Sequence, residues 1–149
     1  MDLKTRFTTE MKEAMKAHEA SKVSVLRMLI AEIKKREIDK RAPLDEAEIL
    51  KVIGSMVKQR QDSVDAFTKG GRDDLAAGER AEIALLQSYL PKQLDRSAIE
   101  AIVTAAIAEV GATSANDLGK VMKAVLPKVA GQADGKVVNE VVRAKLAGA

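Results

Sequence analysis

One imidazole and no thiol limit the chemistry that this chain can perform. His18 is the only histidine among 149 residues, and cysteine is absent. A histidine-dependent triad would have to be built around His18, and zinc, haem and iron–sulfur sites need several histidine or cysteine ligands. His18 lies where the first helical pattern frays, so a surface role is the simpler interpretation. The sequence therefore predicts no catalytic residue, no metal site and no cofactor.

Two pairs of carboxylates remain as candidates for acid–base chemistry, which would require each pair to be buried together. Asp73 and Asp74 form one pair, and Glu79 and Glu82 form the other. Both pairs lie at or near the start of a predicted helix, where acidic side chains stabilise the helix dipole. We interpret both as structural.

A turn between Gly131 and Gly135 has some features of a phosphate-binding loop. A P-loop needs four residues between its glycines, Ser or Thr after the lysine, and a preceding strand. Here three residues separate the glycines, Val137 follows Lys136, and a helix precedes the turn. Nucleotide hydrolysis is therefore excluded. Free N–H groups beside Lys136 still predict an anion-binding turn at Gly135 and Lys136, with a capped tight turn as the alternative.

Positive charge is concentrated in the last quarter of the chain. The formal net charge is +3, and from residue 112 onward six basic residues outnumber three acidic ones. Spacings of three and seven residues place the cations in pairs on helix faces opposite the valines. The resulting basic surface is predicted to bind nucleic-acid phosphates through five side chains: Lys120, Lys123, Lys128, Lys136 and Arg143.

The kind of nucleic acid follows from what this basic surface lacks. No aromatic residue occurs after residue 90, so single-stranded bases have nothing to stack on. Backbone and shape recognition of folded RNA stays open. A solvated charged face without a partner is the alternative. A second basic run, residues 34–36 with 40–41, ends a predicted helix and has three acidic residues interleaved with it, so we interpret it as structural.

Apolar residues repeat at helical spacing along the whole chain, and no segment alternates like a strand. Seven helices are expected, at about residues 3–16, 22–40, 46–69, 75–90, 99–110, 118–125 and 135–146. The sequence predicts an all-α fold. Its N-terminal helical domain, residues 1–94, has four helices, of which the second and third form a long hairpin. Its C-terminal domain, residues 95–149, is a three-helix bundle.

The predicted helix ends rest on capping chemistry. Asp45 with Glu48, and Ser97 with Glu100, have the spacing of capping boxes, and Asp134 is placed to cap the last helix. Glycines at 70–71 and 111 supply positive-φ stops. Two further glycines, at 119 and 135, are expected to let neighbouring backbones approach closely.

Composition sets the remaining limits. Hydrophobic residues make up 46% of the chain and aromatic residues only 2%, which indicates an aliphatic core between helices. No stretch approaches the roughly 18 apolar residues of a spanning helix, and no apolar leader follows the first residues. We therefore expect a cytoplasmic protein without a membrane segment.

The run from Leu118 to Val142 resembles the signature of the GatB/YqeY family. Residues 26–34, 58–63, 70–75 and 89–94 resemble further segments of the same family, in the same order. Together they cover nearly the whole chain and are closest to the free-standing YqeY-like members. The resemblance implies a helical N-terminal part with a long hairpin and a three-helix C-terminal part.

The resemblance also implies a function. The same module forms the tail of the B subunit of the tRNA-dependent amidotransferase, where it contacts tRNA while other domains carry the chemistry. A non-catalytic module that binds tRNA or another structured RNA is therefore expected, in an accessory role with amidotransferase subunits as partners. A label of carbon–nitrogen ligase with glutamine as amido-N donor would be inherited from that complex.

Two other functions stay open from the sequence. One is a protein-interaction adaptor that uses the groove between the hairpin and the C-terminal bundle, and the other is an enzyme in its own right. The chain departs from the expected family pattern at Lys123, where glycine is common, and at Ala130 and Gln132, where basic residues are expected. An altered RNA affinity would follow from these departures.

Overall fold

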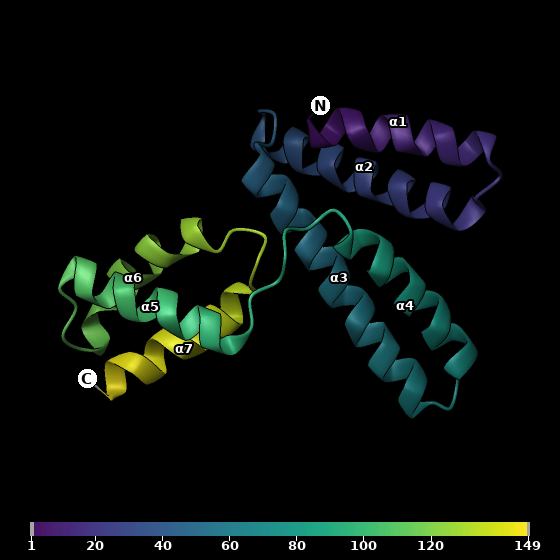
Figure 1. The fold of residues 1–149 in the computed structure, drawn as a ribbon. Helices are drawn as coiled ribbons and strands as arrows, with labels where there is room; N and C mark the ends of the chain where they lie inside the picture. Colours follow the sequence, from purple (N-terminus) through teal and green to yellow (C-terminus); the bar gives the residue numbers. More distant parts are fainter. Residues whose placement is uncertain (1, 149) are drawn as a thin grey trace. The chain divides into compact units, whose positions relative to one another are not determined.

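The computed structural model describes residues 2–148, and in that range every regular element is helical (Figure 1). The prediction of an all-α fold with seven helices is confirmed for these residues. The helices are α1 (Leu3–Lys16), α2 (Ala20–Lys40), α3 (Glu46–Lys69), α4 (Asp73–Gln87), α5 (Arg96–Val110), α6 (Leu118–Val125) and α7 (Gly135–Ala147). Two short 3-10 turns, η1 (Ala115–Asp117) and η2 (Leu126–Lys128), flank α6.

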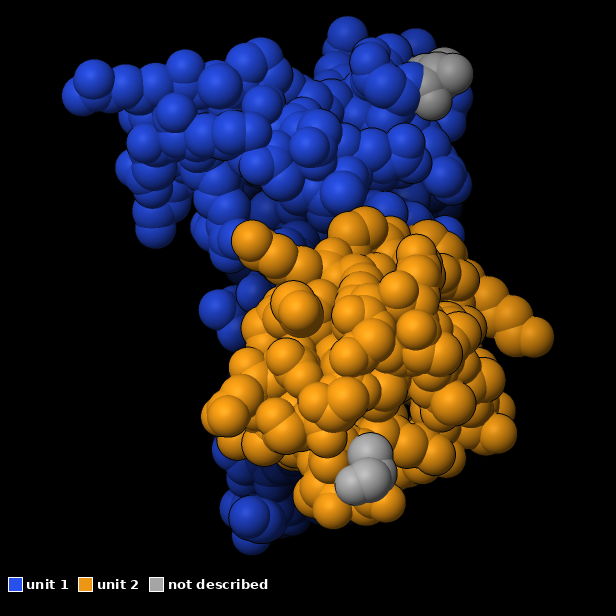
Figure 2. Space-filling model, turned by 90° about the vertical axis from the view of Figure 1, so that its left-hand side faces the viewer, with its two compact units in different colours: residues 1–90 blue, residues 91–149 orange. Residues whose placement is uncertain are grey.

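The chain forms two compact units, residues 1–90 and residues 91–149, which Figure 2 colours separately. The sequence placed this boundary after residue 94. The difference arises because the segment before α5 is bonded to the second unit: the backbone N–H of Leu94 donates to the carbonyl of Gln132 at 2.9 Å. That each unit is a separately folding domain stays a prediction.

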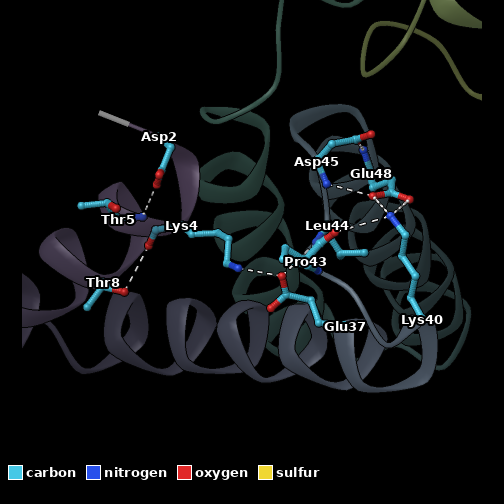
Figure 3. Close-up of polar contacts among 10 residues, drawn as sticks. All are labelled: Asp2, Lys4, Thr5, Thr8, Glu37, Lys40, Pro43, Leu44, Asp45 and Glu48. Atoms are coloured by element: carbon cyan, nitrogen blue, oxygen red, sulfur yellow. Dashed lines mark hydrogen bonds and ion pairs between the residues drawn. The ribbon is translucent and has the colours of Figure 1, made fainter.

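Most predicted helix starts are found in the structure. Asp45 and Glu48 form a capping box, in which each carboxylate accepts from the other residue's backbone N–H at 2.8 Å (Figure 3). Asp2 caps α1 with a single bond, in which its carboxylate accepts from the backbone N–H of Thr5 at 2.8 Å. The predicted box at Ser97 is wrong. Asp95 directly precedes α5 and has extended backbone, and its carboxylate caps the helix by accepting from the N–H of Ala98 at 2.8 Å.

Four helix ends use left-handed backbone. Gly71 and Gly111 have φ of 72° and 67°, so both predicted glycine stops are confirmed. Two non-glycine residues adopt the same conformation, His18 with φ of 58° and Arg41 with φ of 60°. His18 therefore shapes the backbone turn between α1 and α2.

Two antiparallel helix pairs build the first unit, α1 with α2 and α3 with α4 (Figure 1). The predicted long hairpin is thus formed by α3 and α4, whereas the sequence assigned it to α2 and α3. The cause lies in α3, whose apolar residues serve two cores. Ile53, in its first half, is fully buried in the cluster of α1 and α2, while Val64 packs with Ala76 and Ile83 of α4.

The second unit has its own aliphatic core, which α5, α6 and α7 share. Val103, Val121 and Val138 come from the three helices in turn and are fully buried. Gly119 and Gly135 do not serve this packing, because a Cβ at either position would meet nothing within 4 Å. The expectation of a close backbone approach at these glycines is therefore wrong.

Candidate nucleic-acid interface

All five predicted phosphate-binding cations are exposed, and they come from consecutive elements of the second unit. α6 carries Lys120 and Lys123, η2 carries Lys128, and α7 carries Lys136 and Arg143. The helical spacing that predicted this exposure also buries the valines on the opposite sides of α6 and α7.

Lys120 and Lys123 project from α6 on the side opposite the buried Val121 and Val125. Within residues 2–148 neither lysine forms an ion pair. Asp117 is the nearest acidic residue along the chain. Backbone hydrogen bonds from Thr113 and Ser114 lower its pKa most, and Lys120 lowers it further. The Asp117 carboxylate is therefore engaged by the turn before α6, and the two lysines face solvent.

Lys128 differs from the other cations because it has an acidic partner. Its Nζ lies 2.8 Å from Oε2 of Glu109 in α5, and the hydrogen bond lowers the pKa of that carboxyl. Both side chains are well exposed, so the pair is screened by solvent and contributes little to stability. A phosphate that approaches Lys128 must compete with Glu109.

On α7, Lys136 and Arg143 lie away from the buried valines, as predicted. The Nε of Arg143 donates to Oδ1 of Asn139 at 2.7 Å, which fixes the guanidinium along the helix. Glu140 lies four residues after Lys136 and three before Arg143, so it shares their face and is exposed. The position of Glu140 between the two cations follows from helical spacing, and it was missed when the charges were only counted.

The predicted anion-binding turn at Gly135 and Lys136 already holds a carboxylate. Oδ1 of Asp134 accepts from the backbone N–H of Lys136 at 2.9 Å, as the predicted cap of α7. The structure therefore has the capped turn that the sequence left as the alternative. Binding of an external anion there stays a prediction, and such an anion would meet the negative charge of Asp134.

The two cation pairs lie on different helices of one bundle. α6 and α7 pack on each other and on α5 around the same core. In a bundle of three mutually packed helices, the sides opposite the core point in different directions. Each pair thus lies on one helix, and we expect the two pairs to face different sides of the bundle, so that a ligand that meets both must reach around it.

The turn before α7 has a role that the sequence analysis missed. Nε2 of Gln93 donates to the carbonyl of Gly131 at 2.7 Å, and Nε2 of Gln132 donates to the carbonyl of Lys92 at 3.3 Å. Gln132, at a position where a basic residue was expected, thus holds the segment that leads into α5. Both segments belong to the family resemblance, but nothing in their sequences indicates that they pair.

One carboxylate of each pair, Asp74 and Glu82, has an ion-pair partner, which supports a structural interpretation of these two. Asp74 lies in the first turn of α4 and pairs with Arg72 at 3.0 Å, and Glu82 pairs with Arg60 of α3 at 2.8 Å. Within residues 2–148 no three His, Asp or Glu side chains are grouped to hold a metal ion.

In the same range no single helix is long and apolar enough to cross a membrane. One bent pair of segments, α5 with Ala115–Lys128, has the length and the apolar composition of a membrane span, but these are the only grounds for it.

These observations define an all-α protein of two helical units with exposed cations on the second. The Yqey-like protein family matches residues 4–146, nearly the whole chain, and the chain therefore belongs to that family. The resemblance found in the sequence is confirmed.

Curated relatives share the name "Altered inheritance of mitochondria protein 41, mitochondrial". The one from Eremothecium gossypii is 42% identical over 82 residues, which are 54% of this chain and 45% of the relative. The one from Candida glabrata is 36% identical over 99 residues, 65% of this chain and 54% of the relative. The one from Clavispora lusitaniae is 36% identical over 120 residues, which are 78% of this chain and 69% of the relative. The chain spans about half the length of the first two of these relatives.

The expected cytoplasmic localisation is contradicted by these names, since all three relatives are named as mitochondrial. The expectation rested on the lack of an apolar leader and of a long apolar run. A mitochondrial targeting segment is amphipathic and basic rather than apolar, so the criterion was the wrong one.

Proposed function

We propose that this protein binds tRNA or another structured RNA through the exposed cations of its second unit. The observation that supports the proposal most directly is that four of these cations form no ion pair within residues 2–148: Lys120, Lys123, Lys136 and Arg143. A cation that has no acidic partner in the protein is available to neutralise a phosphate and release its condensed counterions.

The composition of the second unit favours a folded RNA over a single strand. Residues 91–149 contain no aromatic side chain, so the unit has no platform for stacking unpaired bases. Contacts to phosphates and 2′-hydroxyls of a helical RNA need only cations and polar groups at the right spacing. Cation pairs on two outer faces of the bundle suit a ligand that is large enough to curve around it.

Lys128 and the start of α7 contribute less than the sequence suggested. Lys128 must exchange Glu109 for a phosphate, which leaves the net number of ion pairs unchanged. Asp134 accepts from the backbone N–H of Lys136, so Lys136 would meet the RNA through its side chain rather than through its backbone. Four contacts carry most of the affinity.

The family supports tRNA as the RNA and an accessory role beside an amidotransferase-like complex. The segment from Leu118 to Val142, which resembles the family signature, contains four of the five cations, and Arg143 directly follows it. The chemistry in such a complex belongs to other domains, so this chain contributes binding and not catalysis.

A binding titration with total tRNA across a salt series tests the proposal. Four phosphate contacts at about −0.7 to −0.9 each give a slope of about −2.8 to −3.6 for the logarithm of affinity against the logarithm of salt. A matched titration with a polyuridine strand should give weaker binding at every salt concentration. A slope near zero, or equal binding of both RNAs, would contradict the proposed function.

A further inference from the structure

The first unit carries an open groove that its own helices leave uncovered. The groove measures about 750 Å³ and lies between the end of α1 and the first half of α2. Two methionines on its walls are unusually exposed, Met15 at 50% and Met28 at 51%. Ala20, Val23 and Ala31 complete an apolar lining. A pocket of this size and composition is typical of ligand-binding or peptide-binding sites.

The groove continues into a face of α2 that has no packing partner in the first unit. Ala20, Ala31 and Ile38 follow one another on the same side of α2, and all are exposed, Ile38 at 75%. The opposite side of the helix carries the buried residues Val25, Leu26, Leu29 and Ile33. Ser24, Arg27 and Lys34 lie on the same side between these residues, so the face combines spaced apolar residues with polar and basic ones. From residue 20 to residue 38 it is about 27 Å long at about 1.5 Å per residue, the length of five turns of a partner helix.

Cations without acidic partners border this face. Arg27, Lys34 and Lys35 are exposed on the same side of α2, and within the described residues none of them forms an ion pair. The sequence interpretation held that interleaved acidic residues offset this basic run, and for Lys34 and Lys35 that is wrong. Glu32 pairs with Arg36 at 3.0 Å, on another side of the helix.

Glu37 is also engaged elsewhere. Its Oε2 accepts from Nζ of Lys4 at 2.6 Å and from the backbone N–H of Leu44 at 2.9 Å, so it faces α1 and the turn before α3 (Figure 3). Glu19, at one end of the groove, is the only acidic residue that lines it among the residues described. Asp39 is exposed four residues after Lys35, so the three cations stand against two carboxylates, Glu19 and Asp39, and the face keeps a small positive excess.

We propose that the groove and the outer face of α2 bind an acidic amphipathic helix of a partner protein. An apolar row in such a helix would fill the groove and cover Met15, Met28 and Ile38, and its flanking Asp or Glu side chains would pair with Arg27, Lys34 and Lys35. Helix-in-groove binding uses apolar anchors at spacings of three and four residues. Exposed methionines suit it because their side chains adapt to the shape of the anchor.

The chemistry of the face argues against the other occupants. A second copy of this chain would place its own Arg27, Lys34 and Lys35 against these three cations, and like charges in contact across an interface repel each other. Phosphates of an RNA could use the cations but not the apolar side chains of the groove, and among the described residues no Phe, Tyr or Trp lines it. An anionic membrane surface is flat, whereas the apolar side chains here line a hollow.

The probe for this proposal is a synthetic 18-residue helix with leucines on one side and glutamates on the other, together with a twin in which lysines replace the glutamates. Binding to the full chain is measured by fluorescence anisotropy, and the contact site by amide chemical shifts. We expect the acidic peptide to shift the amide resonances of the C-terminal end of α1 and of α2. It should also bind at least tenfold more tightly than its twin.

Variants separate the apolar contribution from nonspecific adhesion. Met15→Gln with Ile38→Gln removes two exposed anchors without touching the core, and it should weaken binding of the acidic peptide at least tenfold. Leu75→Gln is the matched control, because Leu75 is 41% exposed in the first unit and lies on α4. It should leave the affinity unchanged.

Several outcomes would overturn the proposal. They are equal binding of the two peptides, no binding of either, or an equal loss in the Leu75→Gln control. Loss of tRNA affinity in an Arg27→Glu, Lys34→Glu, Lys35→Glu variant would assign the face to RNA. Binding of phosphatidylserine vesicles that the Met15→Gln and Ile38→Gln changes abolish would assign it to a membrane. The second unit's cations are unchanged in all these variants, so the RNA proposal is tested separately.

Discussion

The hydroxyl of Tyr89 donates a hydrogen bond to the carboxylate of Glu10, and it ties the end of α4 to the middle of α1. The Tyr89 ring meets the ring of Phe7 edge to face, with centroids 5.0 Å apart, and the guanidinium of Arg6 lies 4.9 Å from the Tyr89 centroid. Arg6 also pairs with Glu10 at 3.1 Å. The last residues of the first unit before the boundary are thus anchored in its core.

Replacing Tyr89 by Phe should destabilise the protein by about 1.5 kcal/mol, the typical contribution of a hydrogen bond to a charged acceptor. The ring contact with Phe7 persists in this variant, so the loss reports the hydrogen bond alone. Chemical denaturation measures the effect. An unchanged unfolding midpoint would show that the bond contributes nothing.

The stability of the same cluster should depend on pH. Burial tends to raise the pKa of Glu10, but hydrogen bonds from Tyr89 and Arg6 outweigh it, and the pKa lies below its usual value of 4.5. A carboxylate whose pKa is lower in the folded state stabilises the protein above the unfolded pKa, and this contribution is lost as pH falls through the folded pKa. The difference in unfolding free energy between wild type and Glu10→Gln should therefore be largest near neutral pH and shrink below about pH 4.5. A difference that does not change with pH would contradict this account.

Arg60 is the buried charged residue of the first unit, at 7% exposed, and it depends on Glu82. Its Nε donates to Oε2 of Glu82 at 2.8 Å, and its Nη2 lies 3.6 Å from Sδ of Met28. Glu82→Ala leaves a buried guanidinium without its carboxylate and should cost about 2 to 3 kcal/mol, below the full range for buried pairs because Glu82 is partly exposed. Arg60→Met fills the site with an apolar chain and should cost less. Urea unfolding of both variants checks this order, and a larger loss in Arg60→Met would refute it.

Two glycines with equally open surroundings should respond in opposite ways to alanine. A Cβ at Gly78 or Gly111 would meet nothing within 4 Å, but Gly78 lies inside α4 while Gly111 has φ of 67°. Gly78→Ala should stabilise the protein by about 0.5 to 1 kcal/mol through helix propensity. Gly111→Ala should destabilise it by about 1 to 2 kcal/mol because of its left-handed backbone. Thermal melts of the two variants that shift in the same direction would contradict this explanation.

Local chemistry was predictable from the sequence to the extent that it is determined by neighbours along the chain. The apolar period of 3.6 residues placed all seven helices, and the three-residue spacing of Asp45 and Glu48 gave their capping box. The cap of α5 was missed because Ser97 and Asp95 both have suitable side chains, and only the path of the preceding segment selects Asp95.

Long-range relationships were not predictable in this way. The pairing of α3 with α4 depends on how the apolar residues of α3 divide between two cores. The helical period of the apolar residues does not show this division. The neutralising role assigned to Glu37 failed because its partner, Lys4, is distant in sequence. At the candidate site, exposure of the five cations followed from helical spacing, whereas the pair Lys128–Glu109 and the capping of α7 by Asp134 determine how available they are.

The tRNA affinity of two charge-reversed variants decides whether the cations of the second unit bind structured RNA. Lys136→Glu with Arg143→Glu changes two cations of the second unit, and Lys34→Glu with Lys35→Glu makes the same change of charge in the first. All four side chains are exposed, so both variants should keep the wild-type melting temperature.

At about 50 mM salt, we expect the Lys136→Glu, Arg143→Glu variant to lose at least tenfold in tRNA affinity, with the salt slope reduced in magnitude by about 1.4 to 1.8 for two lost contacts. The Lys34→Glu, Lys35→Glu variant should bind within twofold of wild type. Equal losses in the two variants, or no binding by the wild type at this salt concentration, would contradict the claim that the second unit is an RNA-binding surface.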